Sequence, residues 1–131
     1  DEVGIAVVGA MDLLVETGDP TRFRTEGQFA RWCGAAPVAA SSGEGRGEPV
    51  HHRLDLAGNR RVNSVLHTMH VTQARCHQPA KDFVARKRTN GKTAKEARRA
   101  HKRQLANRII RRMWDDQQRL RATANSVDRA A

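Results

Sequence analysis

Apolar residues in the second half of the chain recur every three or four positions, which is the spacing of one face of an α-helix. Asn59 is a natural helix cap, and the residues that follow it at this spacing are Val62, Val65, Leu66, Met69, Gln73 and Cys76. Pro79 suits the first turn of a further helix. A longer helix is predicted from about Thr93 to Arg121, and its stripe comprises Ala97, Leu105, Ile109, Met113 and Leu120. This half of the chain is therefore predicted to be helical.

The first predicted helix runs from Ile5 to Thr17. Its residues near helical spacing are Ile5, Val8, either Met11 or Asp12, and Val15. Gly18 follows directly and can adopt the left-handed conformation that ends a helix. We expect these apolar residues to form part of a core that other segments complete.

A second short helix is predicted to begin at Thr25. Thr25 and Gln28 have the spacing of a capping box, in which each residue satisfies a backbone N–H of the other. Gly34 ends this helix, and Phe23 just before the cap is placed to pack on Phe29 or Ala30. Residues 4–34 are therefore predicted to form a small helical hairpin.

The pattern breaks between the two halves. Gly43, Gly45 and Gly47 alternate with polar residues in a stretch that has nothing apolar to bury, and loops of this length are functional or disordered. The predicted fold is all-α, a bundle of about five helices with a Gly/Ser-rich central loop at 35–57 and room for a short β-hairpin there. Basic helices follow at 58–121, and the tail at 122–131 has no stripe and is expected to fray.

Charge is distributed unevenly along the chain. The 131 residues carry 24 Lys and Arg against 14 Asp and Glu, a net charge of +10. Residues 1–50 have a net charge of −4, and residues 81–121 have a net charge of +11. Clustered cations favour a polyanion, because each neutralised phosphate releases counterions. The alternative is a solvated Arg-rich helical face without a partner. No apolar run approaches the ~20 residues of a membrane span, and the long helix lacks a broad apolar face, so no membrane partner is expected.

Serine, histidine and cysteine residues are the candidates for a chemical role in this chain. Ser41-Ser42-Gly43 offers a hydroxyl on a flexible segment beside basic helices, although a serine needs a base or a metal to become a nucleophile. Six histidines and two cysteines lack the paired spacing of a zinc site, so no metal is expected in this chain. Trp32 and Trp114 are interpreted as core anchors. Asp115 and Asp116 are interpreted as charge balance for Arg111 and Arg112. The spacing of the cysteines favours a reduced, intracellular setting.

Five segments stand in an order that resembles one known family. They are Glu-Thr-Gly-Asp-Pro-Thr-Arg-Phe at 16–23, Gln-Phe-Ala-Arg-Trp-Cys-Gly-Ala-Ala-Pro-Val at 28–38, Ser-Ser-Gly at 41–43, Leu-Ala-Gly-Asn-Arg-Arg-Val at 56–62 and Gly-Lys-Thr-Ala-Lys-Glu-Ala at 91–97. From about residue 4 to residue 115 the chain resembles the C-terminal domain of bacterial transposases of the insertion sequence 110 (116/902) class. It departs from the family at Gly34-Ala35-Ala36-Pro37, where Gly-Leu-Ala/Thr-Pro is usual. The chain begins with Asp1 and has no leader, so we expect it to be a single-domain fragment of a longer protein.

The resemblance implies a function. Ser42, with Ser41 as the fallback, corresponds to the serine that forms a covalent link to a DNA phosphate. The acidic cluster that binds Mg²⁺ belongs to an N-terminal ribonuclease-H-like domain absent from this chain, so the fragment alone is expected to be inactive and to hold no cofactor. A guide RNA, DNA and further copies of the protein are the expected partners, in the bacterial cytoplasm.

Charge, rather than a motif, identifies the expected nucleic-acid contacts. They are Arg46, Arg53, Asn59, Arg60, Arg61, Lys95, Arg98, Arg99, Lys102 and Arg103. Two alternatives remain open at this point. The chain could be a basic helical nucleic-acid-binding module without catalytic activity, its Ser-rich loop only a linker. It could also be an adaptor in which the last helix pairs with a copy of itself.

Overall fold

The computed structural model describes residues 2–39, 52–54 and 58–131. The helices are α1 (Val7–Thr17), α2 (Glu26–Trp32), α3 (Arg60–Cys76), α4 (Gln78–Thr89) and α5 (Ala94–Ala130), with a 3-10 turn η1 at Pro20–Arg22. Strands β1 (Pro37–Ala39) and β2 (His52–Leu54) pair antiparallel, with Val38 opposite Arg53. The predicted all-α bundle with a short β-hairpin is confirmed.

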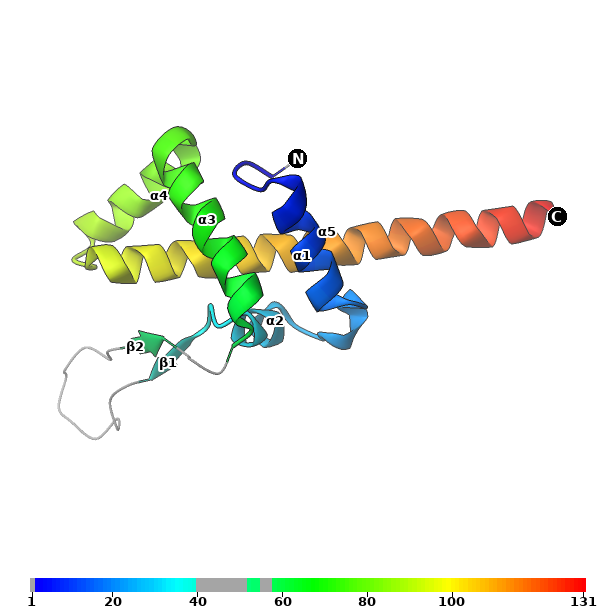
Figure 1. Cartoon of the computed structure of the whole chain (residues 1–131), viewed down its shortest axis with the longest axis horizontal. Coiled ribbons are helices and arrows are strands. Elements are labelled where there is room, and N and C mark those ends of the chain that lie inside the picture. The colour runs from blue at the N-terminus through cyan, green and yellow to red at the C-terminus, as the bar shows by residue number, and fades with distance from the viewer. Residues whose placement is uncertain (1, 40–51, 55–57) are drawn as a thin grey trace.

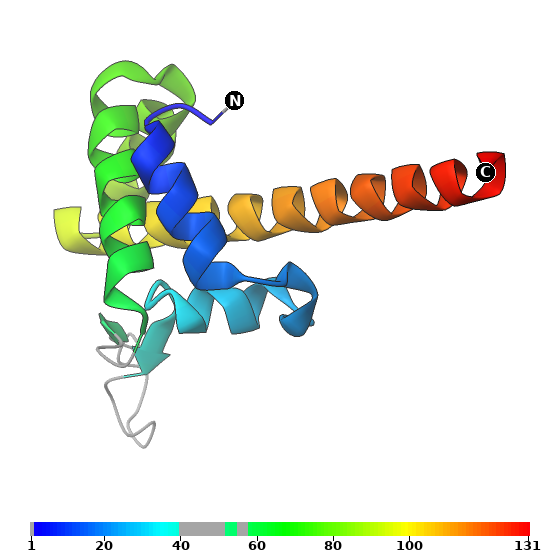
Figure 2. The same ribbon diagram turned by 45° about the vertical axis from the view of Figure 1, so that its right-hand side comes forward.

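Helix α5, with 37 residues, runs along the longest dimension of the molecule (Figure 1). Its first half contacts α2, α3 and α4, and α1 packs on α3. Its second half extends beyond all the other elements in both views (Figures 1 and 2). In the described part of the chain, no helix combines the length and the apolar character needed to cross a membrane.

The core lies where α2, α3 and the first half of α5 meet. Its largest fully buried apolar side chains are Phe29, Val62, Leu66, Met69, Leu105 and Ile110. Phe23 packs edge-on against Phe29 with ring centroids 5.2 Å apart, as predicted, and Trp32 completes an aromatic cluster at 5.2 Å from Phe23. Edge-to-face and tilted arrangements are the favoured geometries for such rings. The spacing in α2, α3 and α5 thus correctly identified most of the buried face.

The face predicted for α1 is wrong. Val8 and Val15 are 70% and 74% exposed, and Met11 is also exposed, whereas Leu13 is buried at 3%. Ile5 is half-buried and lies before the helix begins. The physical reason is that α1 carries apolar residues around most of its circumference, so the periodicity does not distinguish the face that meets α3.

The predicted helix ends are mostly confirmed. Gly18 adopts a φ of 63° after α1, and the Asn59 side chain accepts the Val62 N–H at 3.0 Å at the start of α3. Thr25 accepts the Gln28 N–H at 3.2 Å, but the Gln28 side chain accepts the N–H of Arg24 rather than that of Thr25. The Gln28 N–H is one of the backbone donors that the first turn of α2 leaves open, whereas the Arg24 N–H lies one residue before the cap.

The end predicted for the last helix is also wrong. Residues 122–130 continue α5 instead of fraying, because Ala and Arg favour helix and no Gly or Pro interrupts them. Leu120 is exposed and does not extend the buried stripe. The absence of a stripe in this segment therefore indicates the absence of packing against the core, not the absence of a helix.

Candidate nucleic-acid interface

The two ends of the segment between α2 and α3 are held together at backbone distance. A Cβ added to Gly58 would lie 2.3 Å from the backbone nitrogen of Gly34 and 2.4 Å from its Cα. The Asn59 N–H donates to the Trp32 carbonyl at 2.7 Å. Only glycine allows so close an approach at position 58. The serine-bearing segment therefore leaves and re-enters the helical body at one point.

A buried polar bridge links this point to α5. The Asn63 side-chain amide donates to the carbonyls of Cys33 and Gly34 at 2.9 and 3.1 Å, and its oxygen accepts from Lys102 Nζ. Lys102 is only 8% exposed, and burial, with a contribution from the charge of Arg98, lowers its pKa. Burial also raises the pKa of the Cys33 thiol to about 12, so this cysteine stays protonated. The bridge brings one cation of α5 to the base of the segment.

The predicted nucleophiles lie outside the described residues. Ser41 and Ser42 follow Ala39, the last residue of β1, within three positions, and Arg46 lies farther along the same stretch. Arg53 is described in its backbone pairing within β2. The structure therefore describes the residues on either side of the serines, including Gly34 and Gly58. We call these flanking residues the frame.

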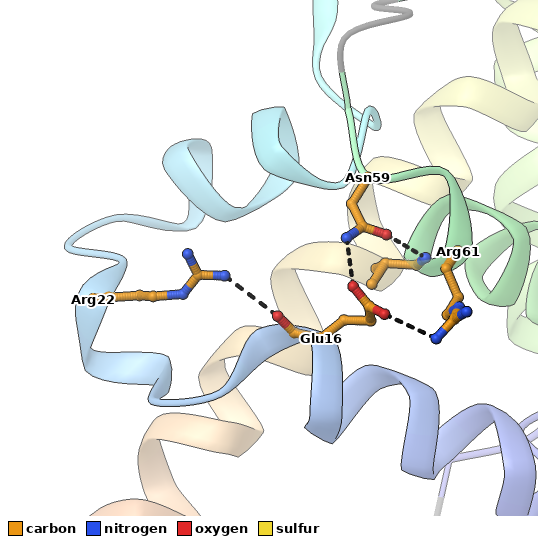
Figure 3. Close-up of polar contacts among 5 residues, drawn as sticks. Glu16, Arg22, Asn59 and Arg61 are labelled. Carbon is orange, nitrogen blue, oxygen red and sulfur yellow. Dashed lines mark hydrogen bonds and ion pairs between the residues drawn. The ribbon is translucent and has the colours of Figure 1, made fainter.

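Two of the predicted nucleic-acid contacts are engaged by α1 (Figure 3). Glu16 Oε2 accepts from the Asn59 side-chain amide at 2.9 Å, and Glu16 Oε1 pairs with Arg61 Nη1 at 3.0 Å. The backbone carbonyl of Glu16 also accepts from Arg22 at 3.5 Å. Arg61 keeps 62% of its side chain exposed, so its ion pair is a surface contact of small energy. Asn59 acts as a helix cap and a tie to α1.

Glutamates of the first half also pair with arginines of α5. Arg111 pairs with Glu26, and both Arg112 and Arg108 pair with Glu2, at 3.3 and 3.5 Å. The prediction that Asp115 and Asp116 balance Arg111 and Arg112 is therefore wrong, because the partners come from the opposite end of the chain; Asp116 lies 3.8 Å from Arg119 instead.

The remaining predicted contacts lie along α3 and α5. Arg60 and Lys95 are exposed, and Arg98 and Arg99 are half-buried. Arg103 donates through Nε to Asn107 at 3.2 Å. Arg60 lies at the start of α3, whereas Lys95, Arg98, Arg99, Lys102 and Arg103 lie in the first half of α5, before this helix extends beyond the other elements.

Sequence reasoning missed further cations on α4 and the turn that follows it. Arg86, Lys87 and Arg88 form the last turn of α4, and Lys92 follows in the turn. The signal was present in the high positive charge of residues 81–121, which was assigned to the last helix alone.

Neither histidines nor tryptophans provide a separate site. His70 is buried against His101, and His67 is exposed. Trp114 is anchored to the body by a hydrogen bond from Nε1 to the Pro20 carbonyl at 2.9 Å. Across residues 2–39, 52–54 and 58–131 no group of three or more His, Cys, Asp or Glu could hold a metal ion.

Comparison with known families gives one match. The family model described as the transposase IS116/IS110/IS902 family matches residues 3–85. The match begins ahead of α1, includes both serines and both sides of the backbone contact at Gly34 and Gly58, and ends within α4. No curated protein matches the chain.

Proposed function

Because the chain belongs to the IS116/IS110/IS902 transposase family, we propose that it delivers a serine nucleophile to DNA during transposition. The observation that carries this proposal is the family match over 3–85, which includes Ser42 and the frame on both sides of it. The frame supports the proposal, because both ends of the serine-bearing segment are held against a basic helical body.

In the proposed reaction, Ser42 Oγ attacks a phosphorus atom of the DNA backbone. A bond forms between Oγ and phosphorus while the bond from phosphorus to the leaving strand oxygen breaks, and the serine proton is transferred to a base. The phosphate charge must be offset during the attack. Buried Lys102 and exposed Arg60, at the base of the segment, contribute positive potential there.

Catalysis requires groups beyond those that this chain displays. The described residues do not form a carboxylate set that fits Mg²⁺, so no step is assigned to a metal on this chain. We place the metal-binding acids in a ribonuclease-H-like domain of the complete transposase, as the family resemblance implies. The same resemblance leads us to propose a guide RNA and an oligomeric complex acting in the bacterial cytoplasm.

The test uses the complete transposase and a DNA substrate that traps covalent intermediates. Ser42→Ala should abolish the covalent protein–DNA adduct on a denaturing gel, whereas Ser41→Ala should retain it. Ser126→Ala, in the exposed part of α5, is the matched control. Adduct formation that is lost in Ser41→Ala and kept in Ser42→Ala would move the role to Ser41. Full strand exchange by both variants would refute the serine mechanism.

One alternative is a non-catalytic nucleic-acid-binding module, which the cations Arg86, Lys87 and Arg88 at the end of α4 also fit. Both functions predict binding that weakens steeply with salt. They differ in the adduct alone, because a binding module forms no covalent bond with DNA under any condition.

A further inference from the structure

Helices α4 and α5 form a hairpin that closes at one end of the molecule. The connecting turn at 90–93 includes Gly91, whose φ is 85°, and the two helices pack against each other (Figure 1). Most of this hairpin lies beyond residue 85, where the family match ends. The family match therefore says nothing about most of this hairpin, and its properties are argued from its residues alone.

The hairpin concentrates the positive charge of the protein. Residues 81–103 contain ten Lys and Arg against two Asp and Glu, a net charge of +8. Residues 115–131, the part of α5 that extends away from the body, contain three of each and are neutral. The start of α5 therefore lies in a strongly positive region, whereas its far end is neutral.

Ion pairing separates the hairpin cations from the arginines near the middle of the molecule. Arg61, Arg108, Arg111 and Arg112 are paired with glutamates of the first half. The hairpin surface, as we name it, comprises Arg86, Lys87, Arg88, Lys92, Lys95 and Arg98. Within the described ranges, none of these six cations forms an ion pair with a carboxylate. Lys87 instead lies 5.5 Å from the ring centroid of Phe83.

Helix stability does not account for this arrangement. Cations in the last turn of α4 are favourable at a helix C-terminus, but Lys95 and Arg98 lie in the first turns of α5, at the positive end of its dipole. The end of one helix and the start of the next therefore bring like charges together. Such concentrated positive potential attracts a polyanion.

We propose that the hairpin surface binds the phosphate backbone of a nucleic acid. The proposal deepens the proposed function and rests on its nucleic-acid substrate, but it adds α4 and the turn to the contacts expected from sequence. Arg86 also lines a shallow hollow with Asp82, Ala85, Thr89 and Asn90, in which Asp82 is the one acidic side chain among the lining residues. Exposed Arg86, Arg88 and Lys92 make the decisive contacts.

The test measures binding of a fluorescein-labelled DNA duplex of arbitrary sequence, and of an RNA hairpin of the same charge, by anisotropy across a salt series. The triple variant Arg86→Gln, Arg88→Gln and Lys92→Gln should weaken binding about tenfold or more and reduce the salt slope by about 2–3, near the value for three lost phosphate contacts. The control is Arg119→Gln, Arg121→Gln and Arg129→Gln, which removes the same charge from the neutral half of α5. It should change affinity less than about twofold.

A conservative variant distinguishes a loss of binding caused by lost charge from one caused by misfolding. Arg86→Lys with Arg88→Lys keeps the charges and should bind like the unmodified chain, since phosphate accepts either cation. The probe whose binding is weakened in the glutamine variant identifies the nucleic acid as DNA or RNA. Equal loss in the glutamine variant and the tail control, or no loss with either probe, would overturn the proposal.

This outcome is separable from that of the serine mechanism. Ser42→Ala should leave both the affinity and the salt slope unchanged. If the hairpin proposal fails, adduct formation by the complete transposase is unaffected; if the serine mechanism fails, the difference between the two triple variants remains.

Discussion

His70 and His101 face each other across the contact between α3 and α5, with their Nδ1 atoms 2.9 Å apart. One Nδ1 donates a hydrogen and the other accepts it, an arrangement that two neutral rings make in opposite tautomers. Burial lowers the pKa of His101 to about 4, and repulsion by protonated His70, by Arg108 and by protonated His77 lowers it further. Burial also lowers the pKa of His70, next to His67, Arg98 and Lys102. The ring of Phe83 also packs against His101, with the two ring centroids 5.6 Å apart.

The pair predicts acid sensitivity. The unfolded chain binds a proton at each histidine near pH 6.5, whereas folded His101 resists protonation until about pH 4. The stabilisation is therefore complete above pH 6.5 and is lost as the pH falls toward 4. We expect the free energy of unfolding to decrease by about 3 kcal/mol across this window. Urea unfolding in a pH series measures the change.

His67→Gln is the matched control for this experiment, because His67 lies on α3 like His70 but is exposed. It should retain the pH dependence. His101→Phe should remove most of it, even though His70 then lacks its partner. A pH profile between 6.5 and 4.5 that is the same in His101→Phe and the unmodified chain would contradict the role of the pair.

The backbone contact between Gly34 and Gly58 predicts a severe effect of a single methyl group. Gly58→Ala places a Cβ 2.3 Å from a backbone atom that belongs to another segment, so one side of the contact must move. We expect a loss of about 2–4 kcal/mol in the free energy of unfolding. Gly27→Ala in α2 meets its nearest atoms only at 3.7 Å and should be neutral or slightly stabilising. Thermal melts of both variants test this, and equal melting temperatures would show that the contact is not tight.

The Asn63–Lys102 bridge predicts non-additive substitutions. Asn63→Leu leaves the buried Lys102 ammonium without its amide partner and should cost about 3 kcal/mol or more. Lys102→Met removes the charge and should cost less, because an apolar side chain of similar length tolerates burial. The double variant should recover part of the loss of Asn63→Leu. Denaturant unfolding of all four proteins gives the coupling energy, and simple additivity would mean that the two side chains act independently.

Local signals in the sequence predicted the local structure well. The glycine after α1, the caps at Thr25 and Asn59 and the stripes of α3 and α5 depend on neighbours within one or two turns, which periodicity and capping rules describe. The ion pair of Arg61 with Glu16, 45 residues away, and the pairing of His70 with His101 depend on how helices cross. Single-sequence rules carry no information on such contacts. For that reason Arg61 and Lys102 were predicted only as contacts for nucleic acid, and Asn59 only as such a contact and a helix cap. Their side-chain bonds to distant residues came from the structure.

Helix α1 offers a direct test of the face that sequence reasoning assigned wrongly. Leu13→Ala should destabilise the protein by about 2–4 kcal/mol, because Leu13 is buried against the core. Val15→Ala should change stability by less than about 0.5 kcal/mol, because that side chain is exposed. Urea unfolding of the two variants distinguishes the faces. The reverse order, with Val15→Ala the more damaging, would show that the helix buries the valine-rich face in solution and that α1 is rotated about its axis.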